Sequence, residues 1–223
     1  MKRFLIALGV CFACVGANNY STASITIIPM FSQSPNTAYY DVTRDFSVSR
    51  NPDGVWKYGW SEGIGGRLVL YSRSSMPSIN NGLEDGWDDP NNDSGFTPSV
   101  ALNTGGDFDD GNVTYSAGAL ILHPCGIDGQ AYCHVIWTAP RRGDYFLNSS
   151  FFAQQYGINV DVHILVKGTS VFDSTITQNT VIRNFTKTLK LSAGDTIDFT
   201  VGPNDNFSLH PGNTGLQAII IPE

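Results

Sequence analysis

Apolar and polar residues alternate along several short stretches of the chain, the pattern of β-strands that bury one face. In the stretch INVDVHILVK (158–167) every second residue is apolar, and most of the others are polar. The stretches 185–191 and 196–201 repeat this pattern, and glycine-bearing turns separate the three. We therefore predict half-buried antiparallel strands at these positions.

Further strand-like runs are distributed over most of the remaining chain, about one every ten residues, and turn residues separate them. This spacing indicates an all-β fold, an antiparallel β-sandwich or jelly roll, formed by a single domain over 24–223. The additional predicted strands are at 24–31, 67–72, 113–115, 119–122, 135–138, 144–153, 170–172 and 216–221.

The segment 74–110 differs from the rest, because it is rich in Asp, Asn, Gly, Ser and Pro. We predict a long excursion over the surface here. Loops of this length in compact domains are usually functional or disordered. The 74–110 excursion is therefore where we first expect a ligand.

The first residues, MKRFLIALGVCFACVGA, have the features of a secretory signal peptide: two basic residues, then a short apolar run, then small residues. Cleavage after Ala17 or after Ala23 fits, so 1–23 is assigned to the signal. No later run is long and apolar enough to span a membrane. We expect a secreted, extracellular protein.

The acidic composition narrows the partners. The chain has 20 acidic residues, and removing Lys2 and Arg3 from its 13 basic ones leaves 11. An acidic chain without a Lys/Arg cluster repels phosphate backbones, so nucleic-acid binding is disfavoured. Extracellular carbohydrate or a matrix component is the expected partner.

Four aromatic residues are candidates for contacting such a ligand. Trp56, Tyr58 and Trp60 occupy alternate positions of one predicted strand, so their rings share a face. They could stack on sugar rings, but we favour a place in the core. Trp87 lies in a polar run without a strand pattern, and it is the best single candidate for a ligand contact.

Carboxylates in flexible loops are suitable ligands for calcium. The 74–110 excursion carries many, although its spacing fails the EF-hand template. A solvated acidic loop is the preferred interpretation, and calcium remains a hypothesis. The candidate ligands are Asp88, Asp89, Asp93, Asp107, Asp109 and Asp110. No other cofactor is expected.

Two cysteines remain after signal cleavage, Cys125 and Cys133. Because exported thiols oxidise, we predict a disulfide between them that closes a hairpin. With His123 and His134 they could instead form a Cys2His2 zinc site, the less favoured alternative.

Five blocks occur here in an order that resembles one family of exported proteins: NPDGVWKYGW, LILHP, VIWTAP, DVHILVKGTSVFD and LSAGDTIDFTVGPNDN. The chain is similar, over about 51–216, to a β-sandwich domain of bacterial proteins that often carry a PEP-CTERM sorting tail. The resemblance implies an exported β-sandwich similar to carbohydrate-binding jelly rolls. Two features depart from the family pattern: Cys125 replaces the usual glycine after His-Pro, and the apolar helix and basic residues of the sorting tail do not follow.

No catalytic motif is recognisable, and a glycoside hydrolase is the least favoured function. Asp161 and His163 share one face of a strand, and we interpret them as a surface pair. We expect a non-catalytic binding module or, as the alternative, a structural matrix protein that calcium stabilises. In a eukaryotic host, N-glycosylation could occur at Asn92, Asn112, Asn148, Asn184 and Asn206.

Overall fold

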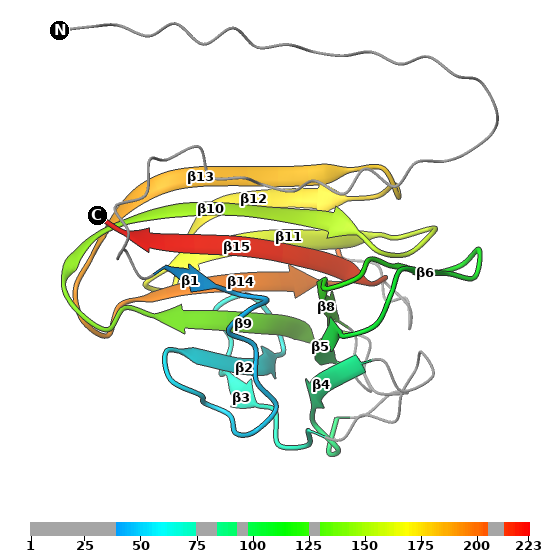
Figure 1. Cartoon of the computed structure of the whole chain (residues 1–223), viewed down its shortest axis with the longest axis horizontal. Helices are drawn as coiled ribbons and strands as arrows, with labels where there is room; N and C mark the ends of the chain where they lie inside the picture. Colours follow the sequence, from blue (N-terminus) through cyan, green and yellow to red (C-terminus); the bar gives the residue numbers. More distant parts are fainter. Residues whose placement is uncertain (1–38, 75–83, 93–97, 125–129, 205–211) are drawn as a thin grey trace, which may run out of the picture. The chain divides into compact units, whose positions relative to one another are not determined.

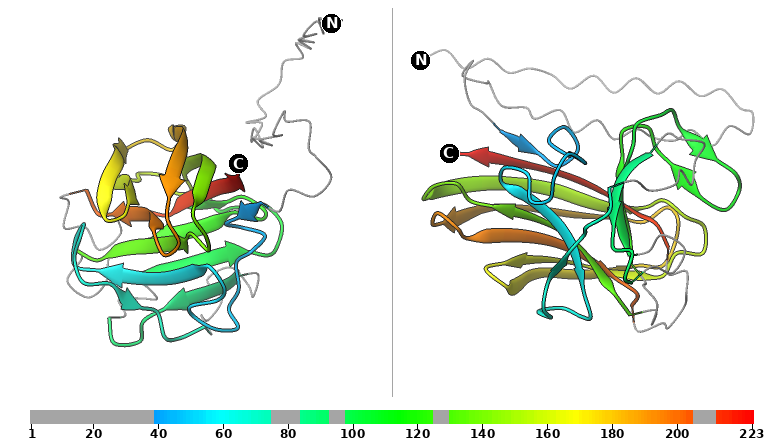
Figure 2. Two further views of the ribbon diagram at one scale, coloured as in Figure 1. Left: turned by 90° about the vertical axis from the view of Figure 1, so that its left-hand side faces the viewer. Right: turned by 90° about the horizontal axis from the view of Figure 1, so that it is seen from below.

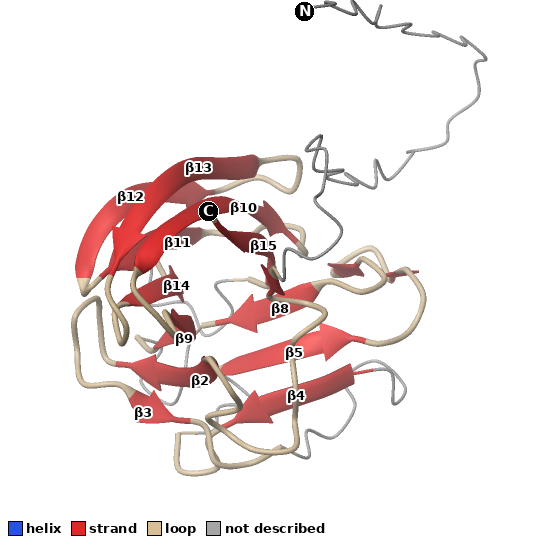
Figure 3. Cartoon of the chain, turned by 60° about the vertical axis from the view of Figure 1, so that its left-hand side comes forward, coloured by secondary structure: helices blue, strands red, loops and turns tan. Residues whose placement is uncertain are grey.

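The computed structural model describes residues 39–74, 84–92, 98–124, 130–204 and 212–223. All of them belong to the compact unit formed by 36–223. Figure 3 shows that this described part is built of strands and loops. The strands pair in antiparallel fashion, which confirms the predicted all-β fold class.

One sheet has seven strands, and Figure 1 shows its long members β13, β10 and β15 side by side. The short strand β1 (Tyr40–Asp41) pairs with β15 outside the main order. In spatial order the other strands are β13 (Ile182–Leu191), β10 (Gly143–Ala153), β15 (Thr214–Pro222), β8 (Leu120–His123), β5 (Ser99–Asn103) and β4 (Glu84–Asp88).

The second sheet has six strands and carries the candidate site described below. A separate short hairpin joins β6 (Phe108–Asp109) to β7 (Thr114–Tyr115). In spatial order the six strands are β12 (Thr169–Ile176), β11 (Val160–Val166), β14 (Thr196–Gly202), β9 (Tyr132–Thr138), β2 (Trp56–Ser61) and β3 (Val69–Leu70).

The two sheets form two layers (Figure 2), and their inner faces share one apolar core. Val160, Val162 and Ile164 of β11 are fully buried in it, as their alternation predicts. The ring centroids of Phe151 and Phe199 lie 6.4 Å apart and connect the sheets. Period-two burial therefore forms this sandwich, with polar residues on the outer sheet faces.

The 74–110 excursion is more regular than its composition predicts. It contains β4 and β5, which pair with each other, and β5 also pairs with β8. The prediction of an irregular surface loop is therefore wrong for these residues, while 75–83 and 93–97 lie outside the described part. Tertiary pairing overrides the low strand propensity of the sequence EDGWD (84–88).

The hairpin β6–β7 covers part of the seven-stranded sheet's outer face. Tyr115 of the hairpin packs with Ile121 and Ala119 in a second, smaller apolar cluster. In the described residues we find no helix with the length and hydropathy of a transmembrane span.

Candidate functional site

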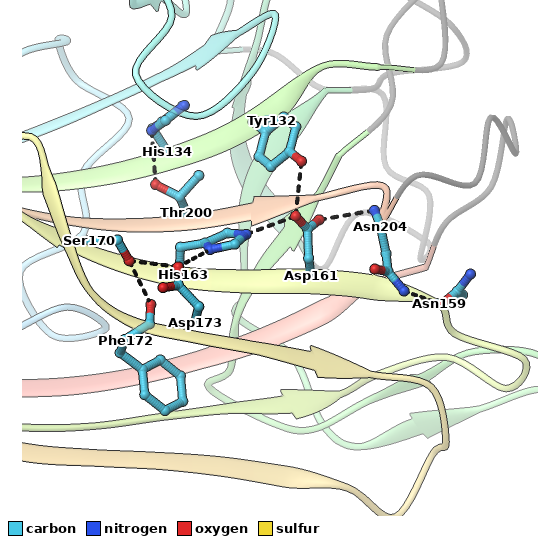
Figure 4. A network of polar contacts seen from close by, with 10 residues as sticks. All are labelled: Tyr132, His134, Asn159, Asp161, His163, Ser170, Phe172, Asp173, Thr200 and Asn204. Carbon is cyan, nitrogen blue, oxygen red and sulfur yellow. Dashed lines mark hydrogen bonds and ion pairs between the residues drawn. The ribbon is translucent and has the colours of Figure 1, made fainter.

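The outer face of the six-stranded sheet carries two neighbouring groups of hydrogen-bonded polar side chains (Figure 4). Residues of β11 that alternate with the core valines point outward, so Asp161 and His163 lie on this face. The strand register places Asp173 of β12 and Thr200 of β14 on either side of His163. The next strand, β9, places His134 beside Thr200.

His163 is held between two carboxylates. Its Nδ1 lies 2.6 Å from Oδ1 of Asp173, and its Nε2 lies 2.7 Å from Oδ2 of Asp161. Since an ionised carboxylate only accepts hydrogen bonds, both ring nitrogens must donate, which requires the imidazolium form. The sequence-based interpretation of Asp161 and His163 as a surface pair is wrong, since His163 is buried.

The pKa values agree with this geometry. Burial lowers the pKa of His163, but the hydrogen bonds to Asp161 and Asp173 outweigh it, and the net pKa is raised. Burial raises the pKa of Asp161, and hydrogen bonds from His163, the Asn204 backbone and Tyr132 bring it below its usual value. Hydrogen bonds from His163 and Ser170 lower the pKa of Asp173. These directions agree with the geometry of two carboxylates around one imidazolium cation.

Asp161 also holds the ring of Tyr132. The Tyr132 hydroxyl donates to Oδ2 of Asp161 at 2.9 Å, across the intervening strand β14. The ring lies over Gly202: a Cβ atom built there would be 1.9 Å from the ring's Cε1 atom. The missing side chain of Gly202 thus leaves room for a half-buried aromatic ring on the polar face.

Two asparagines complete this end of the face. The backbone N–H of Asn204 donates to Oδ1 of Asp161 at 2.9 Å, and its Nδ2 donates to Oδ1 of Asn159 at 2.7 Å. Asn204 has a φ of 47°, in the left-handed region that non-glycine residues rarely adopt. Its two hydrogen bonds hold this conformation, which places its amide next to that of Asn159. We call Tyr132, Asn159, Asp161 and Asn204 the Tyr132 site.

Beside the Tyr132 site is a second network with the residue types of a hydrolase triad. Nε2 of His134 lies 2.7 Å from Oγ of Ser61, and its Nδ1 lies 3.0 Å from both carboxylate oxygens of Asp198. Ser61 is fully buried, however, and its Oγ lies 2.7 Å from the carbonyl oxygen of Gly63. A nucleophile needs access to substrate, so we interpret this network as a structural tie between β2, β9 and β14.

The predicted aromatic contacts are placed differently. Trp87 lies in β4 and is 5% exposed, and its Nε1 donates to the carbonyl oxygen of Ser47 at 2.7 Å. The prediction that Trp87 lies in a loop, where it could contact a ligand, is therefore wrong. Trp56 and Tyr58 are buried in the core, which confirms the favoured interpretation. Trp60 is half-buried against that core.

Those proposed calcium ligands that lie in the described part of the chain do not converge. Asp88 is 1% exposed and forms a bidentate ion pair with Arg73. Asp89 accepts from Nε1 of Trp60 at 2.9 Å. In the described part of the chain, no three His, Cys, Asp or Glu side chains form a group that could hold a metal ion. Three further candidates in and next to the β6–β7 hairpin instead accept hydrogen bonds from backbone N–H groups: Asp107, Asp109 and Asp110. Asp93 lies outside the described residues.

The disulfide and the glycans stay predictions. Cys125 and Asn206 lie outside the described residues, and Cys133 is buried with its Sγ 2.9 Å from the carbonyl oxygen of His123. Cys133 and His134 are consecutive in β9 and point to opposite faces, so they do not share a zinc site. Of the other sequon asparagines, two are exposed, Asn112 and Asn184, and two are half-buried, Asn92 and Asn148.

No local sequence motif indicates the Tyr132 site. Tyr132, Asp161 and Asn204 are far apart in the chain, and only the pairing of β9, β14 and β11 brings them together. One signal was available: the polar positions of the alternating stretch 158–167 include Asn159, Asp161 and His163. A strand whose outward positions carry an acid, an amide and an imidazole is a candidate recognition face.

Comparison with known proteins identifies no relative. No family model matches the chain, and no curated protein matches it. Similar solved structures include rabbit GITRL (TM-score 0.27, 16% identity, 40% of this chain and 70% of that one). Another is a family 35 carbohydrate-binding module from Clostridium thermocellum (TM-score 0.28, 14% identity, 57% of this chain and 82% of that one). A third is a β-glucosidase from Kluyveromyces marxianus (TM-score 0.31, 12% identity, 79% of this chain and 17% of that one). These values are too low to transfer a function, so function is argued from the side chains.

Proposed function

We propose that the protein is an exported, non-catalytic carbohydrate-binding module that binds its ligand at the Tyr132 site. The main observation in support is that a half-buried aromatic ring, two side-chain amides and a carboxylate lie together on one sheet face. Sugars present apolar C–H faces that suit aromatic rings, and hydroxyl groups that suit planar polar side chains.

Preorganisation supports this assignment. Asp161 accepts from Tyr132, His163 and the backbone of Asn204, so the ring and the amide are fixed before a ligand arrives. A site whose side chains are already ordered loses less conformational entropy on binding. The rings first considered as ligand contacts, Trp56, Tyr58 and Trp87, are buried and offer no comparable surface.

Gly202→Ala tests the proposal, because the new methyl group must displace the Tyr132 ring. On a glycan array we expect a specific signal from the wild-type protein and loss of that signal from Gly202→Ala. Gly106→Ala is the matched control: a Cβ there meets nothing within 4 Å, and this variant should bind like the wild type. Circular dichroism and thermal melting establish that each variant is folded.

A second variant separates ring loss from strain. Tyr132→Ala removes the ring without crowding Gly202, and it should also abolish binding while the sheet remains folded. A blank array for the folded wild-type protein, with and without added Ca²⁺, would refute the proposal and favour the structural matrix role. Turnover of any glycan on the array would show an enzyme instead.

A further inference from the structure

The amides of Asn159 and Asn204 form a pair at the edge of the Tyr132 site. Nδ2 of Asn204 donates to Oδ1 of Asn159, which leaves Oδ1 of Asn204 and Nδ2 of Asn159. Within the described residues, neither of these two atoms has a hydrogen-bond partner. Both residues are half-buried, and Figure 4 shows them at the same end of the face as Asp161.

The pair offers a ligand one donor and one acceptor. This holds for either assignment of the two amides, since exchanging O and N in both reverses the internal bond and still leaves one donor and one acceptor. The backbone fixes the pair, because the Asn204 N–H is bonded to Asp161 in the left-handed conformation. The neighbouring ring of Tyr132 is tied to the same carboxylate.

We infer that the Tyr132 site selects N-acetylated amino sugars through the Asn159–Asn204 pair. This inference rests on the proposed carbohydrate-binding function and names its substrate class. An acetamido group is itself a planar amide: its N–H donates to the free amide oxygen of the pair, and its C=O accepts from the free NH2. Its methyl group and the pyranose C–H face provide apolar area for the ring of Tyr132.

The surrounding charge disfavours an anionic ligand. Among the described residues, the hydrogen bonds of the pair lead to Asp161 and through it to His163 and Asp173, and the ionised forms of these three sum to one negative charge. Uronic acids and sulfated sugars would be repelled there. A neutral acetamido sugar meets no such penalty, and its amide uses both free atoms of the pair.

Isothermal titration calorimetry with three neutral or basic ligands of equal length tests the inference. The ligands are oligomers of N-acetylglucosamine, of glucosamine and of glucose. We expect the N-acetylated oligomer to bind about tenfold more tightly than the glucose oligomer, the effect of one to two net hydrogen bonds. The glucosamine oligomer lacks the C=O group and should not share this preference.

Two variants attribute the preference to the pair. Asn159→Asp removes the free donor, and Asn204→Gly removes the other amide while tolerating the positive φ. Each variant should bind the N-acetylated oligomer and the glucose oligomer with about equal affinity. Asn148→Asp, on the outer face of the other sheet, is the control and should keep the wild-type preference.

The outcomes distinguish this inference from the proposed function. If the wild-type protein binds the oligomers without preferring the acetamido group, the inference is wrong and carbohydrate binding stands. If the preference exists but survives in both variants, the assignment to Asn159 and Asn204 is wrong. If no oligosaccharide binds, the proposed function fails and the inference fails with it.

Discussion

Ser61 and His134 show how a familiar set of side chains can serve structure instead of chemistry. Ser61→Ala should lower the free energy of unfolding by about 1–3 kcal/mol, because buried Nε2 of His134 loses its partner. Urea unfolding measures this, with exposed Ser72→Ala as the neutral control. We also expect no adduct at Ser61 after treatment with an alkyl fluorophosphonate. A stoichiometric adduct in the mass spectrum would identify Ser61 as a nucleophile and contradict the structural assignment.

Arg73 and Asp88 form an ion pair that is more important than those at the surface. Arg73→Ala leaves the carboxylate of Asp88 buried without its cation, and we expect a loss of about 3–5 kcal/mol in unfolding free energy. Arg50→Ala breaks a pair in which the arginine side chain is 73% exposed, and it should produce no measurable change. Equal effects for the two variants in denaturant titrations would show that burial does not decide the contribution.

Strand β12 is fastened to β11 by His163, which makes this sheet edge dependent on pH. The raised pKa of His163 stabilises the fold fully below its unfolded value of about 6.5, and this contribution is lost as pH rises through the folded pKa. The lowered pKa values of Asp161 and Asp173 stabilise the fold above their unfolded value of about 3.9. This contribution is lost as pH falls through the folded pKa values.

The difference in unfolding free energy between the wild type and His163→Gln should therefore be largest at about pH 5 and shrink towards pH 9. Chemical denaturation at these two pH values measures it. Asp173→Asn removes one of the two carboxylates that raise the pKa of His163, so the unfolding free energy of this variant should change less between pH 5 and pH 9 than that of the wild type. A difference that stays constant from pH 5 to pH 9 would contradict an imidazolium at His163 held between Asp161 and Asp173.

Among the strands, those with clean alternation were predictable from the sequence and those held by their neighbours were not. β11, β13 and β14 alternate because one face of each packs in the core and the other face carries mostly polar side chains. β4 is a sheet edge whose main chain pairs with β5 and whose Asp88 forms an ion pair with Arg73. Its sequence therefore has the composition of a loop. Long-range pairing also assembles the Tyr132 site, so no local pattern could reveal it.

Trp87 contributes to the stability of the whole sandwich. Its ring belongs to the common core, and its Nε1 ties β4 to the carbonyl of Ser47. Trp87→Ala should therefore cost about 3–5 kcal/mol of unfolding free energy, the usual cost of removing a buried tryptophan ring. Glycan affinity, measured well below the melting temperature, should equal that of the wild type.

Tyr156→Ala is the matched control for Trp87→Ala, because Tyr156 is 40% exposed and lies outside the core. It should change neither stability nor binding. Loss of glycan binding in a Trp87→Ala protein that melts like the wild type would instead place the ligand at Trp87. Because a buried ring and a ligand-contacting ring differ in which of the two measurements they change, melting and binding together decide whether the molecule recognises its ligand through β4 or through the outer face of the other sheet.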